Sequence, residues 1–181
     1  MKWLNALLPV VTLVLGYVGT LVTESRRDAR ARRLAQDERD DQLTAAHAGE
    51  RRTFELETLN ALMVATQRLA RATGAAHHFD LMQAKERGVN TYPSTQLPEA
   101  MSKEAHEAGV EVRRLQALVL DKGTRDLVDA FHSSTASLGT PQVTVAEGNE
   151  QMIRILDAYE AAQEAVGARI RAIYEGPVTT S

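Results

Sequence analysis

Residues 3–23 read WLNALLPVVTLVLGYVGTLVT, and this stretch contains no charged residue. A helix needs about 20 predominantly apolar residues to cross the roughly 30 Å hydrocarbon core of a bilayer. The length and composition of the stretch therefore predict a single transmembrane helix near the N-terminus. We assign the membrane anchor to residues 1–23, with membrane-contacting positions at Trp3, Leu4, Pro9, Gly16, Tyr17 and Gly19.

The features of this stretch favour a membrane helix over two alternatives. Membrane helices tolerate a proline such as Pro9, and the rings of Trp3 and Tyr17 are of the amphipathic kind found at membrane interfaces. A cleaved secretory signal is the first alternative, but its apolar region is usually shorter and an Ala-x-Ala-like cleavage site should follow it. A buried core helix is the second, but the stretch lacks a polar stripe.

A cluster of basic residues follows the apolar stretch, whereas only Lys2 precedes it. Lys and Arg are retained on the cytoplasmic side of a membrane, so we predict a single-pass protein of the cell membrane with its soluble part in the cytoplasm. Lys2 also fits a signal anchor of the opposite orientation. We expect the cluster to contact anionic lipid headgroups, although it also fits a purely topogenic role. Its members are Arg26, Arg27, Arg30, Arg32 and Arg33.

Residues 24–42 are strongly charged and contain one large apolar side chain, Leu34, with no Gly or Pro. This segment cannot bury much surface, but it can continue the membrane helix without a new nucleation cost. We predict a charged helical stalk. Its arginines alternate with acidic residues, it has no aromatic residue to stack on bases, and the whole chain has a net charge of -3. These properties argue against nucleic-acid binding.

Residues 43–176 show helical spacing of apolar residues and no element at the strand period. The first apolar stripe begins at Leu43 and predicts a helix that reaches about Arg87, followed by a loop at residues 88–98. Three more helices should start near Glu99, Arg125 and Val145. The predicted fold is all-α: the N-terminal transmembrane helix continues into a long charged helix, followed by an antiparallel bundle of about four helices and a disordered tail at 177–181.

Two of the predicted helices have the alternating steps of three and four residues that are typical of coiled-coil-like packing. The second helix has this seam at Met101, Ala105, Ala108, Val112, Leu115 and Val119, and the fourth has it at Leu156, Tyr159, Gln163, Val166, Ile170 and Ile173. We expect Gly123 to end the second helix and Thr124 to cap the third. Thr144 and Glu147 predict a capping box on the fourth.

The residues that carry chemistry are few. The absence of cysteine excludes disulfides, thiolate metal sites and cysteine nucleophiles, and no Walker, G-x-G-x-x-G or H-E-x-x-H motif is present. His77, His78 and Asp80 are the best candidates for a zinc site, to which His106 or His132 would have to contribute. Adjacent histidines point in different directions on a helix, so we interpret the pair as one surface and one partly buried histidine. We therefore expect no metal, no cofactor and no catalytic residue.

Two polar positions in the predicted helices have structural interpretations. Ser133 and Ser134 beside His132 lack the sharp turn that exposes a serine nucleophile, so we place them on a helix surface. Gln163 interrupts an apolar seam, where one polar residue can select the register or the number of partners. A partly solvated bundle position is the alternative for Gln163.

These observations favour a membrane-anchored helical interaction or scaffold protein without catalytic activity. Its partners would be the lipid bilayer and either another protein or a second copy, bound through helices. A membrane-tethered sensor that binds a ligand or an ion and transmits a helix rearrangement is one alternative. An envelope-spanning or phage-lysis accessory protein in the opposite orientation is another.

Overall fold

The chain folds into four α-helices in a computed structural model, which describes residues 2–92, 96–136 and 143–176, with side chains from residue 33 onward. The helices are α1 (Lys2–Arg87), α2 (Glu99–Gln116), α3 (Lys122–Thr135) and α4 (Val145–Glu175). The residues described include no strand, and the prediction of an all-α fold is confirmed. The predicted tail at 177–181 lies outside this range.

Helix α1 ends where the sequence predicted, at Arg87. Gly88 follows it with a φ of +65°, a left-handed conformation that glycine adopts without the steric cost of a Cβ atom. The Val89 amide donates to the carbonyl of Ala84, which satisfies one of the free carbonyls at the helix end. The chain then leaves α1 through the connector segment, which we define as residues 88–92.

The helical backbone divides into two compact units, Met1–Glu50 and Arg51–Ser181. In the first unit, every side chain described, from residue 33 to residue 50, is exposed. Among the side chains described, no helix combines the length and apolar character that a membrane crossing requires. The predicted anchor lies outside this set of side chains, so the transmembrane assignment stays a prediction.

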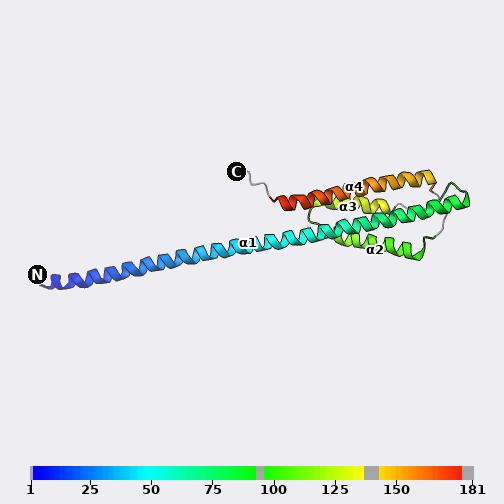
Figure 1. Cartoon of the computed structure of the whole chain (residues 1–181). Helices are drawn as coiled ribbons and strands as arrows, with labels where there is room; N and C mark the ends of the chain where they lie inside the picture. The colour runs from blue at the N-terminus through cyan, green and yellow to red at the C-terminus, as the bar shows by residue number, and fades with distance from the viewer. Residues whose placement is uncertain (1, 93–95, 137–142, 177–181) are drawn as a thin grey trace. The chain divides into compact units, whose positions relative to one another are not determined.

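The second unit is an antiparallel helical bundle (Figure 1). Helix α2 runs antiparallel to the part of α1 from Arg51 onward, α3 runs antiparallel to α2, and α4 runs antiparallel to α3. Helix α3 packs against both α2 and α4. All four helices contribute to one apolar core. Its fully buried members include Leu59, Leu62, Val112, Val119, Val128, Phe131, Ile155 and Val166.

The predicted seam of α2 is largely confirmed, but the predicted end of this helix is wrong. Ala108, Val112 and Leu115 are buried, as is Val119 just beyond the helix. Helix α2 ends at Gln116, well before Lys122, and Lys122 instead begins α3. The N-cap of α3 is consequently not Thr124: the Asp121 carboxylate accepts the Thr124 amide at 2.7 Å and takes that role.

The capping box of α4 is confirmed, because the Thr144 side chain accepts the Glu147 amide and the Glu147 side chain accepts the Thr144 amide. The seam of α4 differs from the prediction at one position. Ile155 is buried, while its neighbour Leu156 is 43% exposed. Both residues are apolar, and a straight helix drifts away from a strict heptad, so the sequence alone does not decide which of the two faces the core.

Candidate functional site

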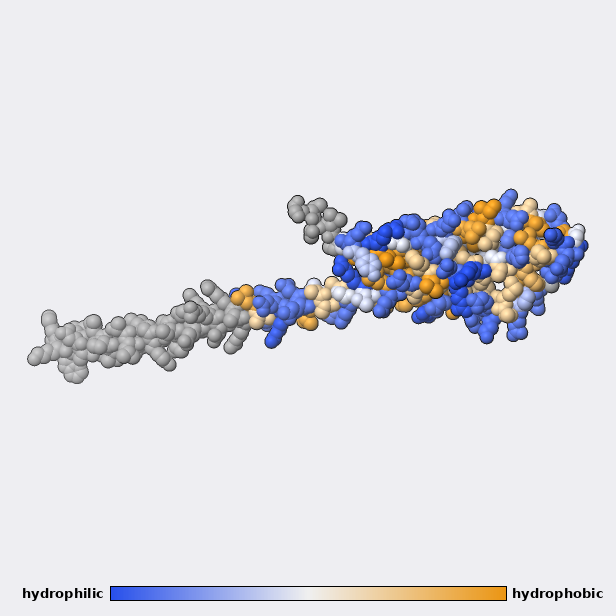
Figure 2. All heavy atoms as spheres, viewed as in Figure 1, coloured by the Kyte–Doolittle hydropathy of each residue, from blue (hydrophilic) through white to orange (hydrophobic). Residues whose placement is uncertain are grey.

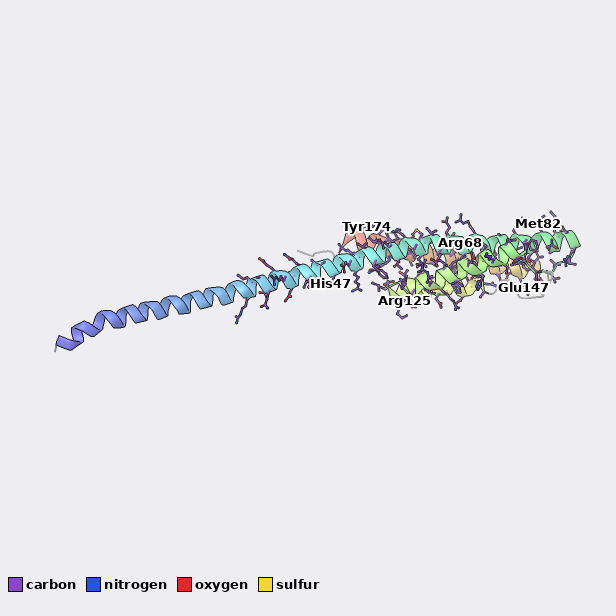
Figure 3. All side chains as sticks on the ribbon, turned by 90° about the horizontal axis from the view of Figure 1, so that it is seen from below. His47, Arg68, Met82, Arg125, Glu147 and Tyr174 are labelled. Atoms are coloured by element: carbon purple, nitrogen blue, oxygen red, sulfur yellow. The ribbon has the colours of Figure 1, made fainter. Side chains whose placement is uncertain are left out.

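A polar cluster that joins several elements lies where α1 ends and α4 begins. Figure 3 shows Met82 and Glu147 toward this end of the bundle, while Arg125 and Tyr174 lie toward the other. The cluster is centred on His77, which lies on α1 and is 9% exposed. His78 beside it is exposed. The pair was interpreted as one surface and one partly buried histidine. His78 lies on the surface as expected, and His77 is buried more completely than expected.

Tyr92 reaches His77 from the connector segment. Its hydroxyl lies 2.9 Å from Nδ1 of His77, and the two rings meet edge to face with centroids 5.8 Å apart. Tyr92 is 6% exposed, although it belongs to a segment that is otherwise exposed. Tyr92 was not among the residues predicted from the sequence to form a site. The available signal was one aromatic residue within a polar loop, since burying a tyrosine there yields a large apolar contact and requires a hydrogen-bond partner.

Backbone hydrogen bonds fix the connector segment against the start of α4. The Tyr92 amide donates to the Val143 carbonyl at 2.9 Å, and the Val145 amide donates to the Asn90 carbonyl at 3.1 Å. The two segments form an isolated antiparallel β-bridge between Thr91 and Thr144. A loop held in this way cannot move away from α4 without losing both bonds.

Gly148 on α4 makes room for the Tyr92 ring. A Cβ atom built at Gly148 would lie 2.3 Å from Cε2 and from the hydroxyl oxygen of Tyr92, which is far inside van der Waals contact. Gly148 is also buried. The ring therefore lies directly on the backbone of α4, and only glycine permits this approach.

Burial controls the protonation of this cluster. It lowers the pKa of His77, and this effect exceeds the opposing effects of a hydrogen bond with Asn149 and of the Asp80 charge. Burial also raises the pKa of Asp80. The pKa of Tyr92 is raised by burial and secondarily by Asp80. The site thus favours the neutral form of each of its three titratable groups.

The cluster does not have the ligand set of a metal site. Among the side chains that the structure describes, no three His, Asp or Glu residues are placed to hold a metal ion together. His106 is exposed on α2. His132 on α3 instead contacts α2 at Gly109, whose carbonyl accepts a hydrogen bond from it. The imidazole and the phenol in this arrangement share a hydrogen bond, and the Asp80 carboxyl group acts on both through its charge.

Gln163 joins α4 to α1 at mid-height in the bundle. Its Nε2 donates to the Met63 carbonyl at 3.1 Å and to Oγ1 of Thr66 at 2.7 Å. Thr66 is 1% exposed, whereas Gln163 is half-buried. The side chain is therefore both partly solvated and engaged in contacts that fix the position of α4 along α1.

Ion pairs also join α1 to α4 and to α2. Arg169 on α4 donates to Glu55 at 2.7 Å, and the Glu55 side chain is 6% exposed. Arg68 donates to both oxygens of Glu104 on α2, at 2.6 and 2.8 Å, from a much more exposed position. Glu55 and Arg169 were not expected from the sequence, because the two residues of the pair belong to helices far apart in the chain.

The structure describes one of the five predicted headgroup-binding arginines. Arg33 is exposed, as contact with a membrane surface would require. Arg26, Arg27, Arg30 and Arg32 lie outside the side chains described, as do the anchor positions Trp3, Leu4, Pro9, Gly16, Tyr17 and Gly19.

Comparison with known proteins found no match: no protein-family model, no curated protein and no solved structure is significantly similar to this chain.

Proposed function

We propose that the chain is a membrane-anchored helical module that acts by binding a protein partner or a second copy of itself, without catalysis. Residues 3–23 would hold it in the bilayer as a single-pass protein, and the arginines of 26–33 would contact anionic headgroups on the cytoplasmic side. The bundle would present the binding surface. The uncharged N-terminal stretch supports the membrane part of the proposal.

An apolar pair on the outer face of α4 supports the binding part. Ile153 is 59% exposed and Leu156 is 43% exposed. Residues three apart are neighbours on a helix surface, so these two side chains form one patch rather than two isolated exposures. Figure 2 shows hydrophobic areas among the hydrophilic surface along the edge of the bundle that α4 forms. Exposed contiguous apolar surface is typical of protein–protein contact sites.

The test uses the full chain in membranes, with chemical crosslinking and with sedimentation in detergent. We expect crosslinked species that weaken when the patch is made polar by Ile153→Ser with Leu156→Ser. Val110→Ser is the matched control, because Val110 is 53% exposed on α2 and lies apart from the patch in the sequence. A chain that stays monomeric and captures no partner in membranes contradicts the proposal.

A sensor is the second candidate, and the polar contacts between α1 and α4 favour it. Gln163 and Arg169 fix the position of α4 along α1, so a ligand that shifts α1 would have to break these hydrogen bonds. Thermal shift measurements with a panel of metal ions and metabolites test this candidate. Stabilisation by one of them supports it, and no stabilisation by any of them counts against it.

A further inference from the structure

The connector segment is held to the bundle through a titratable side chain. The Tyr92 hydroxyl contacts Nδ1 of His77 at 2.9 Å, and the backbone of the same segment pairs with Val143 and Val145. A neutral imidazole has one ring nitrogen that accepts a hydrogen bond, whereas a protonated imidazole has none. In the neutral form, therefore, the phenol can donate to Nδ1 and both groups are satisfied.

We infer that His77 and Tyr92 form an acid-sensitive latch, which holds the connector segment on α4 while the imidazole is neutral and releases it when the imidazole is protonated. The latch lies within the described part of the bundle, so the inference does not rest on the proposed membrane anchor.

Protonation changes the latch in two ways. Nδ1 becomes a donor, so the Tyr92 hydroxyl loses its hydrogen-bond acceptor. The hydroxyl proton then needs another acceptor, although Tyr92 is only 6% exposed. At the same time a positive charge forms on the His77 imidazole, which is 9% exposed. Water can hydrate this charge only if the site opens. Movement of the connector segment away from His77 admits water and relieves both costs.

The surrounding groups decide the sign of the response. On α1, the half-buried Asp80 favours the protonated imidazole and the exposed His78 opposes it. Tyr92 faces the ring from the connector segment, and Asn149 hydrogen-bonds it from α4. Among the described residues of α2 and α3, no charged group acts on His77. The desolvation of the ring outweighs these effects and lowers the pKa of His77.

A lowered pKa means that the open state, with its ordinary histidine, binds the proton more tightly than the closed state does. Opening is therefore increasingly favoured as the pH falls below about 6.5, the pKa of an ordinary histidine. The effect is complete once the pH is below the lower pKa that His77 has in the closed state. Each unit by which the closed-state pKa lies below the open-state value multiplies the ratio of open to closed molecules by about ten at full protonation.

The test measures hydrogen exchange of the full chain in detergent micelles at pH 7.5 and pH 5.0, with rates divided by the intrinsic exchange rate at each pH. The amides of Tyr92 and Val145 report on the latch, because both are bonded across it. We expect their protection to decrease from pH 7.5 to pH 5.0, because protonation of His77 favours the open state. The Val128 amide serves as the reference for the core and should keep its protection.

Two variants separate His77 from other titrating groups. His77→Gln keeps a side chain that can accept from Tyr92 but cannot be protonated, and it should abolish the pH dependence. His78→Gln is the matched control, because it removes the adjacent exposed imidazole and leaves His77 in place. The pH dependence should persist in this variant, although the loss of the His78 charge makes His77 somewhat easier to protonate. Persistence of the pH dependence in His77→Gln overturns the latch, as does its absence in the unaltered chain.

A second measurement covers the case in which His77→Gln fails to fold. The His77 ring is titrated by NMR in the unaltered chain, and its midpoint is compared with the midpoint of the loss of protection at Tyr92 and Val145. Coinciding midpoints below 6.5 support the latch. Loss of protection that does not follow the titration of His77 overturns it.

Discussion

Among the glycines whose surroundings the structure describes, Gly148 is the one at which an added Cβ atom would meet the shortest contacts. Gly148→Ala would place a Cβ atom 2.3 Å from the buried Tyr92 ring, so the ring has to leave its position or α4 has to move. Overpacking of this kind costs about 1–3 kcal/mol. The better helix propensity of alanine offsets at most about 1 kcal/mol of this loss of stability. We expect Gly148→Ala to lower the free energy of unfolding by about 1–2 kcal/mol, measured by denaturant titration.

Gly167 on the same helix provides the control for this substitution. A Cβ atom there would meet only the end of the Arg171 side chain, at 3.4 Å, and that flexible group can move away. Gly167→Ala should therefore raise the free energy of unfolding by up to about 1 kcal/mol. Equal effects at the two glycines would show that the Tyr92 contact does not limit the space at Gly148.

Thr66 offers a second comparison between matched residues. Thr66→Val removes the hydroxyl that accepts from Gln163 and should cost about 1 kcal/mol, because Gln163 keeps only the Met63 carbonyl. The Thr66 hydroxyl itself donates to the carbonyl of Leu62, four residues earlier. Thr44→Val is the control, because the exposed Thr44 makes the equivalent bond to the carbonyl of Asp40. Its effect should stay within about 0.5 kcal/mol. Thermal unfolding of both variants checks the difference.

At the scale of the element, the sequence located the start of a helix well where only one good N-capping residue was present. Thr144 and Glu147 satisfy each other within one turn, so the start of α4 could be located from sequence. Between α2 and α3 two capping residues compete, because Asp121 and Thr124 are both good N-caps. The structure uses Asp121, and the sequence offered no local reason to prefer it.

The candidate site depends on contacts between elements and was harder to predict. The burial of one histidine at 77–78 followed from helix geometry, but its partner did not. Tyr92, Gly148 and Asn149 come together only after the chain has returned through α2 and α3, and no spacing in the sequence indicates that approach. Exposed apolar residues such as Leu156 show the same limit, since burial depends on where the neighbouring helix lies.

The ion pair between α1 and α4 should contribute more than an exposed pair within one helix. Glu55 is 6% exposed, whereas its partner Arg169 is 35% exposed. A double-mutant cycle with Glu55→Gln and Arg169→Met should give a coupling energy of about 1–2 kcal/mol, reduced from the value of a fully buried pair by the access of water to Arg169.

The control for this cycle is the pair Arg171–Glu164, whose side chains are 60% and 75% exposed. Its coupling energy should be below about 0.5 kcal/mol and should disappear in high salt. If the two cycles gave the same energy, the burial of Glu55 would contribute nothing to the strength of its pair.

At the scale of the whole molecule, α1 should not be equally stable along its length. The side chains of residues 33–50 are all exposed, so this part of the helix gains little stability from side-chain burial. Residues 58–69 contribute Leu59, Leu62 and Leu69 to the core. We expect amides of 33–50 to exchange much faster than those of 58–69 in hydrogen-exchange mass spectrometry. Uniform protection would indicate that 33–50 is covered by a partner.

The pairing of Asn90 with Val145 has a kinetic consequence. These residues are separated in the chain by the whole of α2 and α3, so the ends of a long loop must meet before their hydrogen bond can form. Loop closure of this kind is entropically costly, and contacts between neighbours in sequence, such as α3 with α4, can form without it. We therefore expect the connector to dock after the folding transition state. Tyr92→Phe should then accelerate unfolding about fivefold in stopped-flow experiments and leave the refolding rate unchanged.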